Sequence, residues 1–355
     1  MINNNLTENN RLRPVSNGMK ILIATGIYPP EIGGPAQYAL NLFSVWEKQG
    51  HKVSLSIFSK WNFLPTGIRH LAYFFSIISK VWQTDLVLIL DTFSCAFSAT
   101  ILGILFGKKI ILRTGGDFLW EGYVERTDDL VLLSEFYKTR LENLNRKEKI
   151  IFWTIRHVLQ SVDMVVFSTK WQEKIFWYPY GLQNHNTSVI ENYYGPKINL
   201  DSRENFGKEF IASTRKLKWK NITFLEEIFK GTVVSQTGAG LYTKSLSYDE
   251  FLLKINNSYA VILASLGDIS PNMILDAIRL NKPFIMTKET GISDRVSDAA
   301  LFVDPENKRD IQEKILWLLN PENYEKQVEK IKNFSFVHTW EEIASEFLDL
   351  YKSIK

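Results

Sequence analysis

The alternation of short β-branched runs with longer helical stretches constrains the fold of this chain more than any other feature. The β-branched runs are KILIAT, KVSLSIF, DLVLIL, KKIILRT and DMVVFS. Stretches with helical spacing separate them: residues 35–49 after the first run, a stretch that ends near 81 after the second, one that ends near 105 after the third, and about 129–160 after the fourth. Parallel strands require such crossover connections, which are usually helices. The first half of the chain is therefore predicted to form a parallel, doubly wound α/β sheet.

The same alternation restarts in the second half of the chain. A polar, turn-rich segment, SVIENYYGPKINLDSREN, precedes the runs EFIAST, TVVSQT, YAVILAS, KPFIMT and ALFVD, which again alternate with helical stretches. We predict two consecutive α/β domains with a hinge near Val189 to Pro196. The predicted divisions are a flexible lead-in at 1–18, a first domain at 19–188, a second at 189–335 and a closing helix within 336–355.

Composition narrows the class of protein. The chain has 355 residues, 45% hydrophobic and 23% charged, which is typical of a globular protein with two cores. A formal net charge of +3 is too small to indicate a nucleic-acid partner. The one cysteine, Cys95, excludes an internal disulfide and is consistent with a cytoplasmic protein. The apolar stretch 86–106 resembles a membrane span, but Asp91 interrupts it, and we expect a strand followed by a helix.

Two acids, Asp268 and Asp276, lie eight positions apart in SLGDISPNMILDAIRLNKPFI. Ser270 offers an N-cap oxygen, Pro271 suits the first helical position, and the apolar residues that follow have helical spacing. A helix N-terminus favours phosphate, and carboxylates beside it accept hydrogen bonds from sugar hydroxyls. This chemistry suits a nucleotide sugar, while a capped surface helix with two solvated acids is an equal alternative from these residues alone.

The loop YPPEIGGPAQY follows the first predicted strand and contains Gly33 and Gly34. Two side chains are absent where backbone can approach a ligand closely. The loop lacks the three glycines of a dinucleotide fingerprint, so a dehydrogenase is disfavoured, and a tight turn without a ligand is the alternative.

Arg215 ends a predicted strand, and Lys220 begins a helix five residues later. Both lie at the carboxyl edge of a parallel sheet, where ligands of open α/β folds collect. Two cations there can neutralise a diphosphate leaving group without a metal. A solvated basic loop is the alternative, because Lys216 and Lys218 are charged as well.

In combination, these features resemble the retaining family 4 glycosyltransferases of GT-B architecture, from about Lys20 to the C-terminus. Asp268, Pro271 and Asp276 fall on the positions of that family's two glutamates and intervening proline. The further matching positions are Arg215 and Lys220, Gly33 and Gly34, Gly50 and His51, Gly291 and Ile292, and the closing aromatic helix from Phe336 to Tyr351.

The resemblance implies two Rossmann-like domains facing a central cleft, with the closing helix returning to the first. It implies that Arg215 and Lys220 hold the donor diphosphate, that Asp276 holds the ribose and that Asp268 contacts the transferred sugar. The expected donor-binding segment also includes Ser270, Pro271 and Asn272, while Gly33 and Gly34 line the opposite side. The implied reaction moves a sugar from a nucleoside diphosphate to an acceptor hydroxyl with retention, in bacterial surface polysaccharide or glycolipid assembly. The acceptor would be a saccharide or a lipid-linked intermediate.

Three positions depart from the family pattern. Both acids are aspartate where the family has glutamate, which shortens each side chain by about 1.5 Å. Ile269 replaces a common glycine, and Thr114 replaces a histidine in LRTGGDFLWE. Asp117 and Glu121 then become the polar candidates for acceptor contact, and a helix cap is the alternative role of Asp117.

Two alternatives to transfer remain open: a catalytically silent GT-B scaffold and a nucleotide-sugar epimerase. The five histidines show no metal-ligand spacing and no Asp-x-Asp occurs, so no metal or other cofactor is expected. The basic and aromatic segment KWNFLPTGIRHLAYFFSIISKVW is predicted to be a helix packed on the sheet, with peripheral contact at the inner face of a membrane as the alternative.

Overall fold

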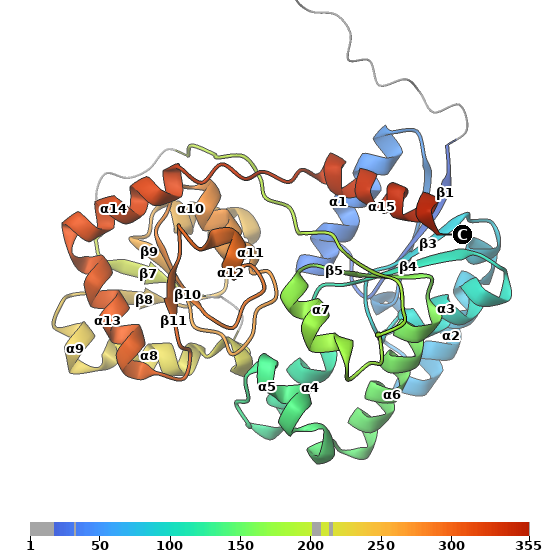
Figure 1. Cartoon of the computed structure of the whole chain (residues 1–355), viewed down its shortest axis with the longest axis horizontal. Coiled ribbons are helices and arrows are strands. Elements are labelled where there is room, and N and C mark those ends of the chain that lie inside the picture. The colour runs from blue at the N-terminus through green and yellow to red at the C-terminus, as the bar shows by residue number, and fades with distance from the viewer. Residues whose placement is uncertain (1–17, 32, 201–206, 213–215, 355) are drawn as a thin grey trace, which may run out of the picture.

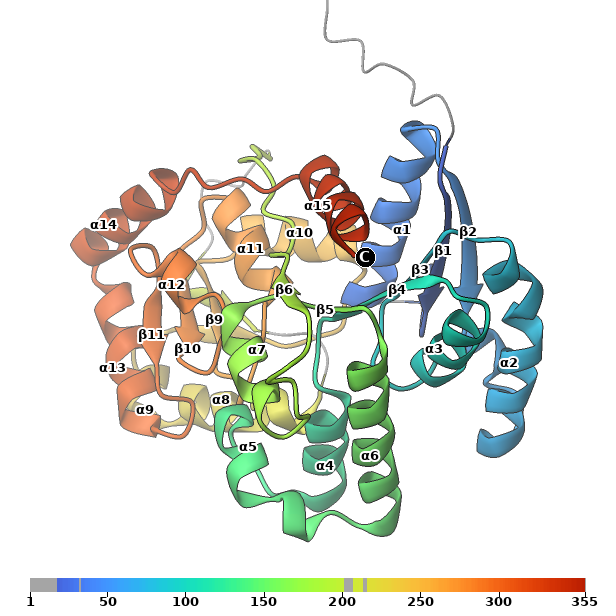
Figure 2. The same cartoon turned by 45° about the vertical axis from the view of Figure 1, so that its right-hand side comes forward.

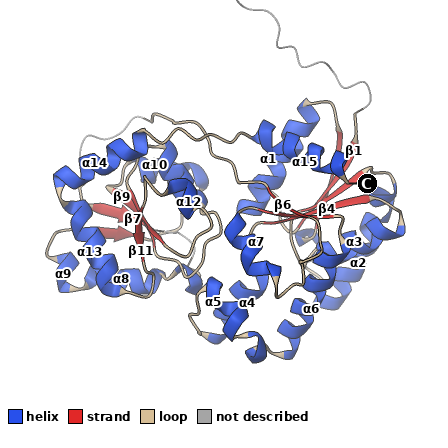
Figure 3. Ribbon diagram, viewed as in Figure 1, coloured by secondary structure: helices blue, strands red, loops and turns tan. Residues whose placement is uncertain are grey.

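The computed structural model describes residues 18–31, 33–200, 207–212 and 216–354, which form two α/β domains side by side (Figure 1). Each domain has a sheet whose paired strands are all parallel (Figure 3). The two-domain doubly wound prediction is therefore confirmed.

The first sheet has the strand order β2-β1-β3-β4-β5-β6 in the described part of the chain. Its strands are β1 (Lys20–Thr25), β2 (Lys52–Ile57), β3 (Leu86–Ile89), β4 (Lys109–Thr114), β5 (Met164–Phe167) and β6 (Thr187–Val189). The helices of this half are α1 (Gly34–Lys48), α2 (Thr66–Trp82), α3 (Ala96–Leu105), α4 (Phe118–Thr127), α5 (Leu133–Thr139), α6 (Arg146–Ser161) and α7 (Lys170–Trp177).

Alternating side chains of these strands enter two separate cores. Leu22 and Val87 pack with α2, α3 and α6 on one face, whereas Ile21 and Ile23 pack with α1 on the other. Side chains at successive strand positions point to opposite faces, so strands buried on both sides are apolar throughout. This explains why the bounds of the β-branched runs agree with those of β1, β3 and β5 to within one or two residues.

The second sheet has the order β11-β10-β9-β7-β8 among the described strands. They are β7 (Glu209–Ile211), β8 (Gly240–Tyr242), β9 (Ala260–Leu263), β10 (Phe284–Thr287) and β11 (Leu301–Val303). The helices are α8 (Ile222–Lys230), α9 (Thr232–Ser235), α10 (Tyr248–Asn256), α11 (Asn272–Arg279), α12 (Ser293–Val296), α13 (Lys308–Leu319), α14 (Pro321–Lys332) and α15 (Trp340–Ser353).

Both sheets have the same topology when their strands are numbered from the first in each domain. In each, the chain starts in the interior, adds one strand on one side and then continues on the other side. The direction of winding reverses between β1 and β3 in the first sheet and between β7 and β9 in the second. Such switch points leave a crevice at the carboxyl edge, where open α/β proteins bind ligands.

The last helix crosses back to the first domain. Figure 1 shows α15 beside α1, far from α14, and its Phe347 is fully buried in the core that α1 covers. Trp46 of α1 donates from its indole Nε1 to the carbonyl of Ala344 at 3.3 Å. The second domain is thus reached by two connections, and an antiparallel bridge between Tyr194 and His338 joins them.

Two predicted elements are wrong and one helix was missed. The run TVVSQT is not a strand: residues 232–235 form α9, with Val234 buried and Val233 exposed, and the strand lies later at β8. The stretch 129–160 is not one helical region, because α5 and α6 are separated by residues 140–145. Helix α4 lies where no helix was predicted from periodicity. The stretch 86–106 is a strand and a helix as expected, and none of the described helices is both long and apolar enough to cross a bilayer.

Candidate functional site

The switch point of the second sheet brings Lys220 and Asp268 together. Lys220 lies in a 3₁₀ turn (Lys218–Lys220) in the connection after β7, and Asp268 lies in the connection after β9. The Lys220 ammonium donates to Asp268 Oδ2, and the two side chains are only 9% and 13% exposed. The Lys220 ammonium also lies 4.3 Å from the centre of the Trp219 ring. A cation and an acid from separate loops therefore meet where the topology predicts a ligand site.

Local backbone features fix these two residues. Asn221 has φ +59°, a left-handed conformation that asparagine tolerates, and its side chain donates to the carbonyl of Pro305 at 2.9 Å. On the other side, the Asp268 amide donates to the carbonyl of Glu289 at 2.9 Å. The hydrogen bond between Asp268 and Glu289 joins the connection after β9 to the connection after β10. Both members of the ion pair therefore lie in loops that are tied to other parts of the second domain.

Helix α11 begins at Asn272, with Pro271 as its N-cap and no side-chain cap. The prediction that Ser270 caps this helix and that Pro271 occupies its first turn is therefore wrong by one residue. The Ser270 hydroxyl is instead buried without a hydrogen-bond partner among the described residues. A buried, unpaired hydroxyl beside a helix N-terminus is an unsatisfied group that a ligand oxygen can satisfy.

Asp276 lies inside α11 and is only 5% exposed. Its Oδ1 accepts from the Tyr248 hydroxyl at 3.1 Å and from Arg279 Nη1 at 3.0 Å. Burial raises the pKa of the Asp276 carboxyl, and the Arg279 guanidinium opposes that rise. Tyr248 was not predicted from sequence, although its position after Ser247, which with Glu250 forms a capping box, marks it as the first residue of a helix.

The first domain faces this region through its glycine loop. Gly34 begins α1, and a Cβ on it would lie 3.5 Å from Asn272 Nδ2 at the start of α11. Gly33 precedes it as the N-cap, in an extended conformation. We call Gly34, Lys220, Asp268 and Asn272 the interdomain site, because Gly34 and Asn272 bring the N-terminal ends of α1 and α11 close together and Asp268, paired with Lys220, lies in the connection that leads to α11.

The polar candidates after β4 have a different environment. Asp117 is 2% exposed, caps α4 by accepting from the Trp120 amide at 3.0 Å, and accepts from the Tyr137 hydroxyl at 2.7 Å. Burial raises the pKa of its carboxyl to about 6. The Thr114 hydroxyl donates to the carbonyl of Gly116 at 3.1 Å and is 1% exposed. Glu121 is half-buried beside Gly116, so its contact with an acceptor, like that of Thr114, stays a prediction.

Arg215 lies outside the described residues. The site has a described cation in Lys220, and the pairing of Arg215 with Lys220 stays a prediction. Among the described residues, no group of three or more His, Cys, Asp or Glu side chains is arranged to hold a metal ion.

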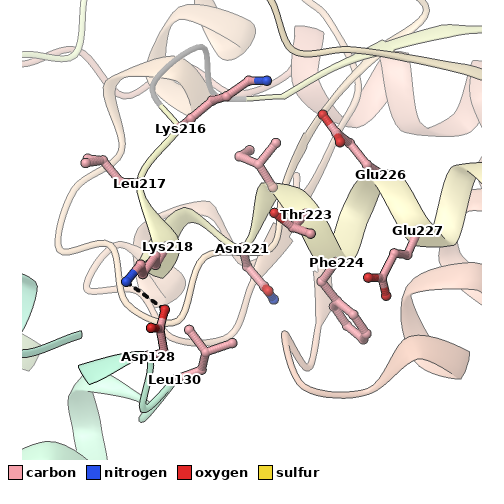
Figure 4. A pocket seen from close by; sticks show the side chains of 11 residues that line it. Asp128, Leu130, Lys216, Leu217, Lys218, Asn221, Thr223, Phe224, Glu226 and Glu227 are labelled. Atoms are coloured by element: carbon pink, nitrogen blue, oxygen red, sulfur yellow. Dashed lines mark ion pairs between the residues drawn. The ribbon is translucent and has the colours of Figure 1, made fainter. Parts of the chain in front are cut away.

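A pocket of about 470 Å³ is lined in part by the connection that precedes α8, including Lys216, Lys218 and Asn221 (Figure 4). Its lining includes three carboxylates and two ammonium groups, from Asp128, Glu226, Glu227, Lys216 and Lys218. Lys218 pairs with Asp128 of the first domain at 2.6 Å, so one cation is already neutralised. An excess of carboxylates disfavours a diphosphate, and no residue of the interdomain site lines this pocket. We therefore place the candidate site at the Lys220 and Asp268 pair.

The fold is that of the GT-B proteins. No family model matches the chain, and no curated protein matches it in sequence. Three solved structures match almost the whole chain: Anabaena HepE in complex with UDP, sucrose-phosphate synthase from Thermosynechococcus elongatus, and the lipopolysaccharide outer core galactosyltransferase WaaB in its apo form. HepE is 12% identical over 94% of this chain and 100% of its own, with a TM-score of 0.64.

The other two structures agree with this match. The synthase is 10% identical over 94% of this chain and 98% of its own, with a TM-score of 0.66. WaaB is 13% identical over 94% of this chain and 99% of its own, with a TM-score of 0.57. At such low identities, the similarity establishes the fold of the whole chain.

Proposed function

We propose that this protein is a retaining glycosyltransferase that transfers a sugar from a nucleoside diphosphate to an acceptor hydroxyl. The observation that carries the proposal is the Lys220 and Asp268 pair at the switch point of the second sheet, in which Asp268 belongs to the connection that leads to α11, the helix whose Asn272 lies beside Gly34 of α1. HepE, a structure of the same fold, was solved in complex with UDP-glucose. A nucleotide sugar bound between the domains would meet a cation, an acid and two helix N-termini.

Each polar group of the candidate site has a role in donor binding that its chemistry suits. The Lys220 ammonium stabilises the diphosphate as its bond to the sugar breaks, and Arg215 supplies a second cation. The first amides of α11 and the unpaired Ser270 hydroxyl face phosphate oxygens, for which a helix N-terminus is suited. Asp276 accepts from the ribose hydroxyls beside Tyr248, and Asp268 accepts from hydroxyls of the transferred sugar. No metal is needed, because the cations balance the leaving-group charge.

In the proposed reaction, the bond between the anomeric carbon and the diphosphate oxygen breaks while the acceptor oxygen attacks from the same face. The acceptor hydroxyl gives its proton to the departing phosphate. Ion-paired Lys220 is released from Asp268 when the diphosphate binds, since a phosphate oxygen then takes the ammonium and a sugar hydroxyl takes the carboxylate. The acceptor is a saccharide or a lipid-linked intermediate of surface polysaccharide or glycolipid assembly.

Nucleotide binding is the first test. The full chain is screened by thermal shift against UDP, GDP, ADP and their sugars, and the cognate donor raises the melting temperature because it binds only the folded state. Release of nucleoside diphosphate with and without candidate acceptors then separates transfer from binding. A bound donor that is never turned over would identify a silent scaffold, and a changed sugar still attached to the nucleotide would identify an epimerase.

The Lys220→Ala variant tests the site. We expect turnover to fall by about 10²-fold or more, the usual cost of losing one charge aimed at a developing anion. Lys216→Ala is the matched control, since it removes a neighbouring ammonium that belongs to the pocket of Figure 4 and should retain turnover within about threefold. Equal turnover in the two variants would refute the site assignment.

A further inference from the structure

Three helices of the first domain form one layer over the sheet. Figures 1 and 2 show α2, α3 and α6 on the side of the first sheet opposite to α15. Their inner sides are buried in a shared core, to which Ile77 of α2, Leu102 of α3 and Ile155 of α6 contribute. Each helix therefore turns its opposite side away from the sheet.

The outward sides of these helices are apolar. The exposed apolar side chains recur every three or four residues, or every seven, which places them on one side of each helix. We call them the outer apolar face: Ile68, Leu71, Phe75 and Trp82 of α2, Phe97, Ile101, Ile104 and Leu105 of α3, and Ile150 and Trp153 of α6. Leu71, Phe75 and Trp82 are 62%, 67% and 64% exposed, so the protein's own core does not cover them. Because α3 packs against both α2 and α6, these side chains lie on neighbouring helices, and an exposed apolar surface of this kind marks an interaction surface.

The exposed charged side chains of these three helices all have one sign. The cations on the three helices are Arg69, Lys80, Arg146, Lys147, Lys149 and Arg156. All residues of α2, α3 and α6 are described, and their only acid is Glu148, whose side chain is 8% exposed and accepts from Arg126 Nε and Nη2 at 2.6 and 2.8 Å. On α6 the cations Arg146, Lys147, Lys149 and Arg156 flank Ile150 and Trp153, whereas Lys80 of α2 donates to the carbonyl of Leu55 in the first sheet. The outer apolar face therefore has a basic border at α6, with no exposed carboxylate on the three helices.

We propose that the outer apolar face binds the surface of an anionic lipid bilayer. Its aromatic and aliphatic side chains enter the boundary between headgroups and acyl chains, and the lysines and arginines of α6 contact lipid phosphates. This combination of one apolar side and a cationic border is how helices lie in a membrane interface without spanning it. A second copy of the chain is a poorer occupant, because a symmetric contact would bring two cationic borders together.

Vesicle sedimentation with the full chain tests the proposal and requires no donor or acceptor. We expect the protein to bind vesicles of phosphatidylglycerol and phosphatidylcholine and to dissociate at about 0.5 M salt, since screening weakens the charge contribution. Binding to pure phosphatidylcholine should be at least about tenfold weaker. The same measurement applied to Leu71→Ser/Phe75→Ser and to Lys147→Glu/Lys149→Glu should show a loss of about tenfold or more for each pair.

A control pair, Leu253→Ser/Trp317→Ser, removes exposed apolar side chains of the second domain and should leave vesicle binding within about twofold. Circular dichroism confirms that each variant is folded, which is expected because the substituted side chains are exposed. Absence of binding by the unmodified chain, or equal losses in the control pair, would overturn the proposal. So would a dimer in light scattering that Leu71→Ser/Phe75→Ser converts to a monomer without any vesicle binding, since the face would then join two copies.

Discussion

Asp117 and Asp268 occupy comparable places in the two domains but have different environments. Each lies a few residues beyond the carboxyl end of an inner strand, β4 or β9. Asp117 is closed off, because it caps α4 and accepts from Tyr137. Asp268 pairs with a cation from another loop and keeps part of its side chain exposed. The comparison teaches that position at a sheet edge is insufficient: a ligand-binding acid must also be free to exchange its protein partner.

The same substitution at both positions should have the largest and most unequal effect on activity. We expect Asp268→Asn to lower turnover by about 10²-fold, since in the proposed reaction it removes the charge that faces the transferred sugar. Asp117→Asn should change turnover by less than about threefold, because the amide oxygen still caps α4. Steady-state release of nucleoside diphosphate measures both. A larger loss of turnover in Asp117→Asn than in Asp268→Asn, at a pH where both variants are folded, would contradict the distinction between the two acids.

Stability should depend on pH through Asp117. Its folded pKa of about 6 exceeds the ordinary value of 3.8, so the folded state binds the proton more tightly than the unfolded state does. This stabilising contribution is complete below about pH 4 and is lost as the pH rises through about 6, to a total of about 3 kcal/mol. Urea unfolding at intervals from pH 4 to 7.5 measures it.

Asp117→Asn serves as the control for that titration. As the pH rises, the unfolding free energy of the unmodified chain should fall by about 3 kcal/mol relative to that of the variant, which lacks the titrating carboxyl. A difference that stays constant across the window would show that Asp117 has the same pKa in the folded and unfolded states.

The packing of the two domains can be disturbed at Gly267. A Cβ there would lie 2.5 Å from Leu133 Cβ and 3.0 Å from the Trp120 ring, both of the first domain. We expect Gly267→Ala to lower the unfolding free energy by about 1–3 kcal/mol, because the overpacked contact must shift. Turnover should fall as well, since the Asp268 backbone moves with its neighbour.

Substitution of Gly122 should have the smallest effect on stability, and of the opposite sign to that of Gly267. It lies in α4, and a Cβ there would meet nothing within 4 Å. Gly122→Ala should raise the unfolding free energy by about 0.5–1 kcal/mol, the ordinary gain of alanine in an exposed helix. Thermal or urea unfolding of Gly122→Ala and Gly267→Ala tests whether the protein tolerates an added methyl group in α4 but not at the contact between the domains. Two destabilised variants would contradict this distinction.

The sequence located the strands better than it located the contacts. Strands buried on both faces are apolar at every position, which is why β1, β3 and β9 could be predicted from local pattern. The run TVVSQT failed because the strand preference of β-branched residues depends on packing partners, and residues 232–235 instead form a short helix with one buried side chain, Val234. Local sequence cannot distinguish these cases, since packing on α8 and α13 decides between them.

The site was predictable to the extent that topology determines it. The sequence predicted Lys220 at the carboxyl edge of a sheet and Asp268 just before a helix, but only the strand order places the two at one switch point. The Tyr248 contact to Asp276 could not be predicted, because it joins α10 to α11 through tertiary packing alone. The closed environment of Asp117 likewise depends on Tyr137, twenty positions further along the chain.

The return of α15 to the first domain makes the second domain an insertion between two parts of the first. Residues 190–196 lead out and residues 333–339 lead back. These connections are held together by reciprocal backbone hydrogen bonds of 3.0 Å between Tyr194 and His338. A single linker would allow the domains to swivel in any direction, whereas a paired strap permits mainly bending about one line. Any opening of the two domains would then be restricted mainly to rotation about this strap, so that the same surfaces of α1 and α11 come together each time the domains close.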